Sequence, residues 1–444
     1  MQPFGSKTRV GGLKMHRPST PVVFVACLTC VAALSYLAGK YSPSASEALA
    51  QAPQGDDTNA ASLSLDRSIG PVEPRGLYFP NTEKLAPDEM RIISLGTGMP
   101  SGRRSQAASA WLVELGNGDK FLFDIGTGSA ANLGSLEIPY DYLDKLFISH
   151  LHTDHMGDLP ALYVGGVVGN RVGPLRVWGP SGSEPRLGTA HSLKHLQEFL
   201  AWDIEGRKGR LPASAFEIEV HEFDYKGENQ VVYEENGVTV RSWPAIHVID
   251  GSVSYSLEWK GLKFVFGGDT YPNKWFNEYA KDADLAIHEC MMAPELWVDK
   301  YKFPVARALE VATQIHTAPE AFGKIMSTIE PRMAVAFHFF NDPDTRFLTF
   351  EGVRSTYSGP LSMADDLMVW NVTRDEVRVR TVAPIDDAWP TPSQRPIPPI
   401  DTAGMKNVSP RIQQGTFDVI EQNKMIYDRV NRKYGTNIKM RVTK

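Results

Sequence analysis

Cysteine is almost absent from this chain of 444 residues. Of its three cysteines, Cys27 and Cys30 fall in an apolar N-terminal run and only Cys290 lies in the body of the sequence. A disulfide-held scaffold and a cysteine-rich zinc site are both excluded, because each needs several cysteines in the folded part of the chain. For Cys290 the sequence predicts a small, buried, apolar residue.

An excess of basic charge is lacking as well. Lys and Arg total 46 against 52 Asp and Glu, which gives a formal net charge of −6. Without a basic excess the chain has little with which to bind a polyanion, so nucleic acid is a disfavoured partner. The composition, 42% hydrophobic and 22% charged, is typical of a globular protein and excludes wholesale disorder.

The pattern of charge and hydrophobicity in residues 1–40 predicts a signal peptide or a membrane anchor. Residues 1–20 carry several basic residues and no acidic one, and residues 22–39 then contain no charge. The uncharged run is just long enough to span a bilayer, so the sequence favours equally a signal peptide that is cleaved and a segment that anchors the protein in the membrane. The charge asymmetry predicts export to the periplasm or another extracytoplasmic space. Residues 41–87, rich in Ser, Ala, Pro and Asp, predict a flexible tether.

Residues 88–383 predict a single domain of strands with interposed helices. Alternating or continuous apolar runs predict strands, and three-and-four spacing predicts helices at 192–202 and 318–329. The predicted strand segments are 91–100, which enters a Gly-rich turn, 108–115, 120–128, 143–150, 216–223, 237–243, 252–259 and 262–268, with a closing hairpin at 367–382. This pattern favours an α+β protein with two sheets and outer helices. Residues 384–444 begin as a Pro-rich linker, and an amphipathic segment at 415–435 predicts a helix packed on the body or on a partner.

The most informative motif is H-x-H-x-D-H, formed by His150, His152, Asp154 and His155 directly after a predicted buried strand. A tight loop can bring these three imidazoles and one carboxylate together. Imidazole and carboxylate suit Zn²⁺, Mn²⁺ and Fe alike. Because the motif offers more ligands than one catalytic zinc needs, the spacing favours two metals per chain.

Three further candidate ligands stand singly at the ends of predicted strands: His247, Asp269 and His338. A lone histidine after an apolar strand is weak evidence for a metal. Three such strand ends downstream of an H-x-H-x-D-H motif jointly predict a metal centre.

In these motifs the sequence resembles the metallo-β-lactamase superfamily, and within it the ribonuclease Z and arylsulfatase-like branch. The segments LGTGMP, LFDIGTG, ISHLHTDHMGDLPAL, RVWGPSG, FGGDT, IHE, HTAPEAFGKI and AFHF occur in family order across residues 91–383. The resemblance implies a four-layer αββα sandwich with two zinc ions at one end of the paired sheets.

The resemblance also implies which residues hold the two metals. One metal takes His150, His152 and His247, the other takes Asp154, His155 and His338, and Asp269 bridges them. The remaining histidines have no assigned role and are interpreted as surface residues: His16, His191, His195 and His221.

Further roles follow from the same comparison. His316 corresponds to the acid that protonates the leaving group, with Glu289 as its orienter and His288 as a supporting residue. Asp124, at a strand end, is expected to orient a ligand histidine, because a metal-bound imidazole usually donates its other N–H to a carboxylate. Arg103, Arg104, Tyr271 and Asn341 are weaker candidates for contacts with substrate.

The sequence departs from ribonuclease Z between His247 and Asp269. A strand, a turn and a second strand fill this interval, so the tRNA-gripping arm that ribonuclease Z carries there is missing. Together with the negative charge and the predicted export, this opposes tRNA 3′-processing.

The function predicted from the sequence is an exported, binuclear zinc hydrolase that cleaves a small ester with a metal-bound hydroxide. Phosphodiesters and sulfate esters are the preferred substrates, with phosphodiesters slightly ahead. Lactone or β-lactam hydrolysis on the same fold is the alternative, because a fold does not fix its substrate. A di-iron redox protein is disfavoured, since the chain has no flavodoxin-like segment and no acidic residue between His152 and Asp154. The resemblance also allows a homodimer.

Overall fold

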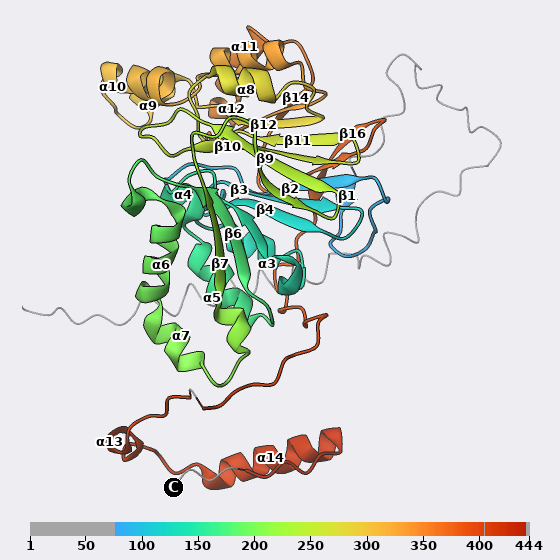
Figure 1. Cartoon of the computed structure of the whole chain (residues 1–444), viewed down its shortest axis with the longest axis vertical. Helices are drawn as coiled ribbons and strands as arrows, with labels where there is room; N and C mark the ends of the chain where they lie inside the picture. The colour runs from blue at the N-terminus through green and yellow to red at the C-terminus, as the bar shows by residue number, and fades with distance from the viewer. Residues whose placement is uncertain (1–75, 404, 441–444) are drawn as a thin grey trace, which may run out of the picture. The chain divides into compact units, whose positions relative to one another are not determined.

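The computed structural model describes residues 76–403 and 405–440, in which two β-sheets lie face to face between two layers of helices (Figure 1). The order of strands in the first sheet is β1-β16-β15-β2-β3-β4-β5-β6-β7. Its strands are β1 (Leu77–Tyr78), β2 (Met90–Gly96), β3 (Ala110–Leu115), β4 (Lys120–Ile125), β5 (Lys145–Phe147), β6 (Leu175–Pro180), β7 (Ile218–Phe223), β15 (Met368–Val372) and β16 (Val377–Val382).

The second sheet has the order β14-β13-β12-β11-β10-β9-β8. Its strands are β8 (Gln230–Glu235), β9 (Val238–Pro244), β10 (Val253–Trp259), β11 (Leu262–Phe266), β12 (Leu285–Glu289), β13 (Ala334–Phe337) and β14 (Leu361–Met363). β11, β12, β13 and β14 pair in parallel, and β9 runs in the same direction because it is antiparallel to β10. The carboxyl ends of β9, β11, β12 and β13 therefore meet at one edge of this sheet.

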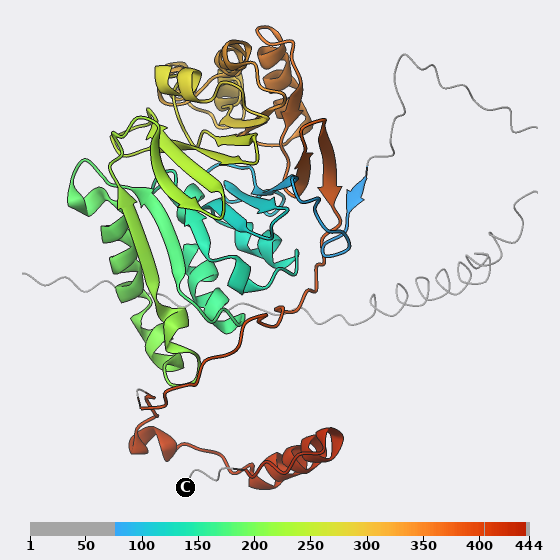
Figure 2. The same cartoon turned by 45° about the vertical axis from the view of Figure 1, so that its right-hand side comes forward.

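Helices cover the outer face of each sheet (Figure 2). The first sheet is covered by α3 (Ser129–Gly134), α5 (Leu159–Val168), α6 (Thr189–Phe199) and α7 (Ala201–Arg207). The second is covered by α8 (Lys274–Tyr279), α9 (Pro294–Asp299), α10 (Val305–Glu310), the π-helix η4 (Val311–Ile315), α11 (Pro319–Ile329) and α12 (Pro343–Arg354). Short 3₁₀ turns are η1 (Tyr140–Tyr142), η2 (Pro185–Leu187) and η3 (Ala213–Phe216). The expected αββα sandwich is confirmed.

The core between the two sheets is rich in aromatic residues. The ring of Phe123 on β4 lies 5.2 Å from that of Phe147 in its own sheet, and 5.7 Å and 5.1 Å from those of Tyr255 and Phe264 in the other. All four side chains are fully buried. Such aromatic contacts across the layers hold the sheets at a fixed separation, and this keeps the loops at their common end in register.

Truncating this contact is expected to be costly. Phe123→Ala should lower the free energy of unfolding by about 3–5 kcal/mol, because it leaves a cavity between the sheets that the surrounding rings cannot fill. Phe199→Ala is the matched control: Phe199 is 81% exposed, so its truncation should change the free energy of unfolding by less than about 0.5 kcal/mol. Urea titrations of both variants measure the difference, and equal losses would contradict this account of the core.

Most predicted elements are confirmed, with local differences. The predicted helix at 192–202 is divided into α6 and α7. The tether predicted for residues 41–87 extends too far, because β1 pairs with β16 and Tyr78 is buried beneath the guanidinium of Arg91, 4.1 Å from its ring centroid. An edge strand of two residues has too little periodicity to be detected in a sequence.

The C-terminal segment follows the body and ends in a helix. Thr391 Oγ1 donates to the carbonyl of Glu137, and Ser393 Oγ donates to Asp141 in η1. After α13 (Pro410–Gln413), α14 (Ile420–Tyr434) confirms the predicted helix, but none of its residues is buried. The predicted packing of this helix on the body is therefore not found in the structure.

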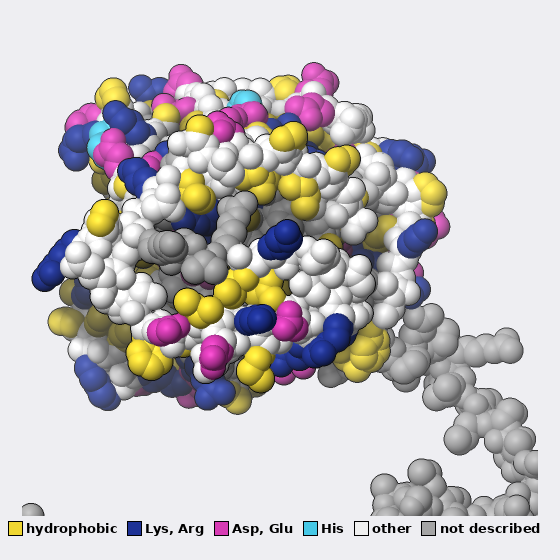
Figure 3. All heavy atoms as spheres, turned by 90° about the horizontal axis from the view of Figure 1, so that it is seen from below, with side chains coloured by type: hydrophobic (Ala, Val, Ile, Leu, Met, Phe, Trp, Pro, Cys, Tyr) yellow, Lys and Arg dark blue, Asp and Glu magenta, His cyan; other side chains and the backbone are white. Residues whose placement is uncertain are grey.

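Two expectations about the surface bear on partners. No helix among residues 76–403 and 405–440 is both long and apolar enough to span a membrane, and the apolar run at 22–39 lies outside these residues. On the face shown in Figure 3, basic and acidic side chains are interspersed among hydrophobic ones. That face presents no field of a single sign.

Candidate metal centre

The candidate ligands meet at one end of the two sheets. His150 follows β5, His152 precedes α4 (Thr153–Met156), and Asp154 and His155 lie on α4 itself. His247, Asp269 and His338 follow β9, β11 and β13, whose carboxyl ends share one edge. Strand direction in the second sheet thus brings single residues from distant parts of the sequence to the loop that follows β5.

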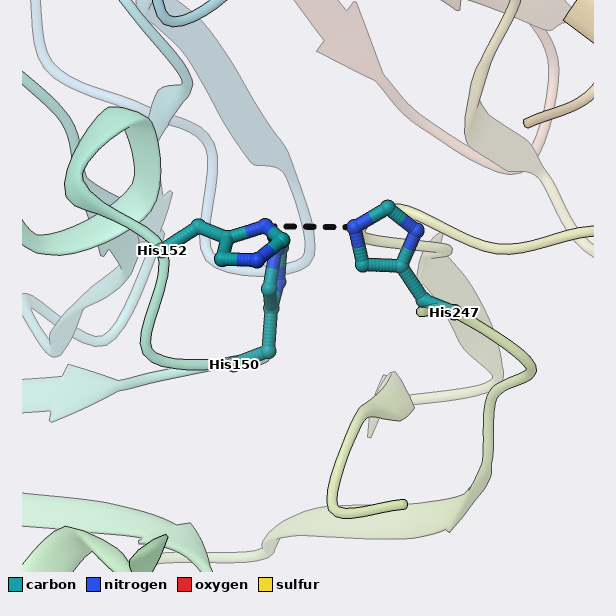
Figure 4. A group of neighbouring side chains, drawn as sticks. All are labelled: His150, His152 and His247. Atoms are coloured by element: carbon teal, nitrogen blue, oxygen red, sulfur yellow. Dashed lines mark hydrogen bonds between the residues drawn. The ribbon is translucent and has the colours of Figure 1, made fainter. Parts of the chain in front are cut away.

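Three histidines form the first ligand group (Figure 4). The Nδ1 atom of His152 lies 3.0 Å from Nε2 of His150 and 3.2 Å from Nε2 of His247. Nitrogens bound at about 2.1 Å to one tetrahedral zinc lie roughly 3.3 Å apart, so these separations fit a shared cation. Burial lowers the pKa of His247 to about 4 and that of His150 well below its usual range. Both imidazoles are therefore neutral at physiological pH, as metal ligands must be.

Asp154, His155, Asp269 and His338 form the second group, and all four are buried. Nε2 of His338 lies 3.1 Å from Asp269 and 3.2 Å from Asp154, and Nε2 of His155 lies 3.2 Å from Asp269. Although burial opposes it, the carboxylates of Asp269, Asp154 and Asp124 raise the pKa of His155 well above its usual range. These carboxylates thus favour positive charge at this position, which a divalent cation would supply.

The two groups adjoin at Asp269. One of its oxygens, Oδ2, is 3.1 Å from Nε2 of His338 in the second group and 3.9 Å from Nε2 of His247 in the first. The rings of His150 and His155 are 4.1 Å apart. Buried atoms without a hydrogen-bond partner include Asp154 Oδ1, His155 Nε2 and Asp269 Oδ1. Leaving such atoms unpaired is costly, and a pair of cations bridged by Asp269 would satisfy them. The residues present therefore fit two metals.

Asp124 orients a histidine of each group. It accepts hydrogen bonds from Nδ1 of His155 at 2.6 Å and from the hydroxyl of Ser149 at 2.8 Å. Because the Ser149 hydroxyl donates its proton to Asp124, its oxygen accepts a hydrogen bond from Nδ1 of His150, 3.0 Å away. In both imidazoles Nδ1 carries the proton, and Nε2 is left free to bind a metal. Asp124 is buried at φ 58°, a left-handed conformation that aspartate tolerates better than most residues.

Removing this carboxylate is expected to weaken both sites. Asp124→Ala should lower metal affinity about 10–100-fold, the usual effect of losing a group that orients a ligand. Asp124→Asn keeps a hydrogen-bond acceptor for Ser149, so its metal affinity should fall less than that of Asp124→Ala. Competition titrations with a chromogenic chelator measure the affinities, with the exposed Asp375→Ala as control. Wild-type affinity in Asp124→Ala would refute the orienting role.

A second carboxylate and histidine pair lies beside the ligand groups. Nδ1 of His316, which follows the π-helix η4, is 2.8 Å from Oε2 of Glu289, and the His316 ring lies 5.0 Å from that of His247. The other oxygen of Glu289 accepts the backbone N–H of Thr270 at 2.7 Å. Glu289 thus ties His316 to the segment that carries Asp269, and Nε2 of His316 has no hydrogen bond within the described part of the chain.

His288 lies elsewhere. Successive residues of a strand point to opposite faces, so while Glu289 points toward the ligands its neighbour on β12 points into the helix layer. His288 packs 4.5 Å from the ring of Phe276, and its Nδ1 donates to the backbone carbonyl of Glu289. Burial lowers its pKa to about 4. The structure does not bring this imidazole to the ligand groups.

Two of the four residues that were predicted to contact substrate interact with other residues of the protein instead. Arg103 forms a two-pronged ion pair with Asp342 at 2.7 Å and 3.2 Å, and the amide of Asn341 donates to Asp365 at 3.0 Å. Both interactions join segments more than twenty residues apart, so local sequence could not reveal them. Arg104 is exposed, and Tyr271 lies 37% exposed after Asp269.

Other residues at the site were not anticipated. The backbone and hydroxyl of Thr97 donate to Asp366, and the carbonyl of Thr97 accepts the N–H of His338. Burial raises the pKa of Asp366 to about 6. The aliphatic loop after His247 was also missed, although two β-branched residues in a loop are an available clue. Of the unassigned histidines, His191, His195 and His221 are exposed as expected, and His16 lies outside the described residues.

Comparisons with known proteins show what this chain is similar to. Residues 90–298, just under half of the chain, match the family model described as anti-Pycsar protein Apyc1. Ribonuclease Z of Thermococcus onnurineus is 28% identical over 266 residues, which cover 50% of this chain and 80% of that protein. Ribonuclease Z of Mycobacterium marinum is 29% identical over 206 residues, which cover 45% of this chain and 70% of that protein.

Among solved structures, the metallo-β-lactamase fold protein YhfI from Bacillus subtilis aligns with a TM-score of 0.49 at 18% identity, over 64% of this chain and 100% of that one. In its sequence relatives, its two-sheet fold and the arrangement of its ligand groups, the chain resembles the ribonuclease Z-like hydrolases of the metallo-β-lactamase superfamily.

Proposed function

We propose that this protein is a hydrolase that binds two divalent cations, zinc in the first instance, and cleaves a small phosphodiester outside the cytoplasm. The observation that carries the proposal is Asp269, which lies between a group of three histidines and a group of two histidines and an aspartate. When bound, two cations lower the pKa of a water and offset charge on the ester oxygens.

The protein's own residues supply the remaining steps. Glu289 holds Nδ1 of His316 at 2.8 Å and so fixes the direction of the ring. His316 is 12% exposed at its side chain, which leaves it accessible to a bound ester. A proton delivered from Nε2 to the departing oxygen would stabilise the leaving alcohol. Asp124 orients the rings of His155 directly and of His150 through Ser149, so that their Nε2 atoms face the metal positions.

RNA processing is the second candidate, because the sequence relatives are named ribonuclease Z. One feature of the fold opposes it. Between His247 and Asp269 the chain forms a short loop and the hairpin of β10 and β11, whose strands pair from Tyr255 with Phe266 to Trp259 with Leu262. This interval leaves no room for a substrate-gripping arm.

The test combines metal content with turnover. The full chain, purified without chelator, is analysed by metal mass spectrometry and assayed against bis-nitrophenyl phosphate, nitrophenyl sulfate, a lactone, nitrocefin and a precursor tRNA. Two zinc ions per chain with phosphodiester turnover are expected. Turnover of only the sulfate, the lactone or nitrocefin would replace the proposed substrate, and cleavage of precursor tRNA alone would favour the second candidate.

Export is tested separately. Fusing alkaline phosphatase, which is active only outside the cytoplasm, to the C-terminus should give an active reporter, and deleting residues 1–40 should abolish its activity. Membrane fractionation of the same cells distinguishes an anchored from a released protein. An inactive reporter on the full chain would refute export without affecting the proposed chemistry.

A further inference from the structure

Two cavities of different size meet at His247. The smaller, of about 260 Å³, is lined by His150 and His152 together with Pro180, Arg186 and Leu187. The larger, of about 830 Å³, is lined by Trp275, Arg307, Gln314 and Ile315, among others. Both are also lined by residues 247–251, so this one loop forms a wall between them.

The dividing loop is apolar and held in place. Ile246 is 46% exposed, and Val248 and Ile249 are each 61% exposed. Val248 has φ 25°, a strained conformation for a β-branched residue. The loop is tied at both ends, because the carbonyl of Ile246 accepts the N–H of Tyr271 at 2.7 Å and Asp250 accepts the hydroxyl of Tyr225 at 3.1 Å. Exposed aliphatic side chains on a fixed, strained loop are suited to contact a ligand.

The segment that precedes the candidate proton donor lines the larger cavity, whereas the His316 ring lies 5.0 Å from that of His247, which lines both cavities. Gln314 and Ile315 line the larger cavity and immediately precede His316. An acid must reach the oxygen of the leaving group, so the leaving group has to extend toward His316. The smaller cavity opens instead onto the three-histidine group, on the other side of the loop.

The charged residues that line the cavities favour uncharged groups of a ligand. Arg186, in the smaller cavity, pairs with Glu184 at 2.9 Å, and Arg307, in the larger, pairs with Glu310 at 2.8 Å. The larger cavity is also lined by Lys226, but the carboxylates of Glu228, Asp250 and Glu310 offset its charge and that of Arg307. Neither cavity therefore has the basic excess that would select a polyanion. The anionic part of the substrate belongs at the metals.

Building on the proposed function, we propose that the two cavities receive the two organic arms of an asymmetric phosphodiester: a small retained arm beside Leu187 and a larger leaving arm beside Gln314. In the reaction the oxygen of a water forms a new P–O bond and the water gives up a proton to solvent. The P–O bond to the leaving arm breaks, and the departing oxygen takes a proton from His316, which solvent then replaces. The retained arm stays on phosphorus in the smaller cavity. A sulfate monoester has only one arm and would leave that cavity empty.

The test uses two opposed variants and two substrate series. In one series the leaving arm is nitrophenyl and the retained arm grows from methyl to phenyl. In the other the retained arm is methyl and the leaving arm grows from nitrophenyl to nitronaphthyl. Leu187→Trp should lower kcat/KM about tenfold or more for the phenyl retained arm only, because the indole fills the smaller cavity. Gln314→Trp should lower kcat/KM by a similar factor only for the substrate with the nitronaphthyl leaving arm, because the indole narrows the larger cavity.

A binding measurement separates this inference from the proposed function. Calorimetry with methyl(phenyl)phosphinate and diphenylphosphinate, which have two arms but no hydrolysable bond, should show that Leu187→Trp weakens only the diphenyl compound. Val168→Trp, at an exposed position on α5, is the control and should bind both as wild type does. Equal effects of both cavity variants on all compounds, or no effect of either, would overturn the inference. Absence of any phosphodiester turnover with selective phosphinate binding would instead overturn only the proposed chemistry.

Discussion

His338→Ala is expected to lose one of the two metals and, with it, turnover. Its Nε2 is the atom that lies within 3.2 Å of both carboxylates of the second group, Asp154 and Asp269. Without it these two carboxylates have His155 alone to help hold a cation, and buried negative charge is left poorly compensated. Turnover should fall by a factor on the order of 10²–10³ or more, the range found when one preorganised electrostatic group is removed from an active site.

The measurement is metal content per chain together with kcat for the best phosphodiester. Backbone strain is a separate effect, because His338 has φ 71° and alanine tolerates that conformation poorly. His338→Asn serves as the second variant, since asparagine accepts a left-handed backbone but offers no imidazole. His191→Ala, at an exposed histidine, should match wild type. If either His338 variant kept two metals and wild-type kcat, the ligand assignment would be wrong.

The candidate ligands could be predicted from the sequence, and the physics that gathers them is simple. Parallel strands end at a common edge, so His247, Asp269 and His338 at the ends of β9, β11 and β13 converge in the structure. The H-x-H-x-D-H motif needs only a tight turn to gather its own members. The sequence indicated the candidate ligands by local pattern, and the family resemblance implied how they divide between two metals. The strand directions that bring them together were not predicted and come from the structure.

What could not be predicted depends on contacts between distant segments. Arg103 and Asp342 are 239 residues apart, and their ion pair removes Arg103 from the candidates for substrate binding. Asp366 reaches Thr97 from 269 residues away. No local pattern encodes such pairings. The placement of His288 differs, because strand alternation would have excluded it once Glu289 was assigned to the site.

The loop after His247 is an intermediate case. Its length follows from the hairpin of β10 and β11, which the sequence predicts, and so does the absence of an arm. Its role as a wall depends on Tyr271 and Tyr225, which tie it down from other elements. The sequence thus indicates that the arm of ribonuclease Z is absent from this interval, whereas the structure shows which loop occupies it.

His316→Ala is expected to separate poor from good leaving groups. A departing nitrophenolate is stable without a proton, whereas a departing alkoxide is not, so an acid matters only for the second. Loss of a general acid typically costs about 10²–10⁴-fold. His316→Ala should therefore lower kcat by that order for an alkyl methyl phosphate and by less than about tenfold for nitrophenyl methyl phosphate. Metal content should not change if the two metals lie at the groups that adjoin at Asp269, because His316 is in neither and shares only a third candidate group with His247 and Glu289.

Glu289→Gln distinguishes proton donation from simple packing. Glutamine keeps the size of the side chain and an acceptor for the Thr270 N–H, but removes the negative charge that faces His316 across 2.8 Å. If Glu289 acts by orienting and supporting a protonated His316, Glu289→Gln should show the same dependence on leaving group as His316→Ala, in weaker form, and the double variant should lose no more than His316→Ala alone. Equal losses for alkyl and nitrophenyl substrates would mean that His316 binds the ester rather than protonating it. The group of His247, Glu289 and His316 would then be part of the anion-binding surface, and the proton for the alkoxide would have to come from solvent.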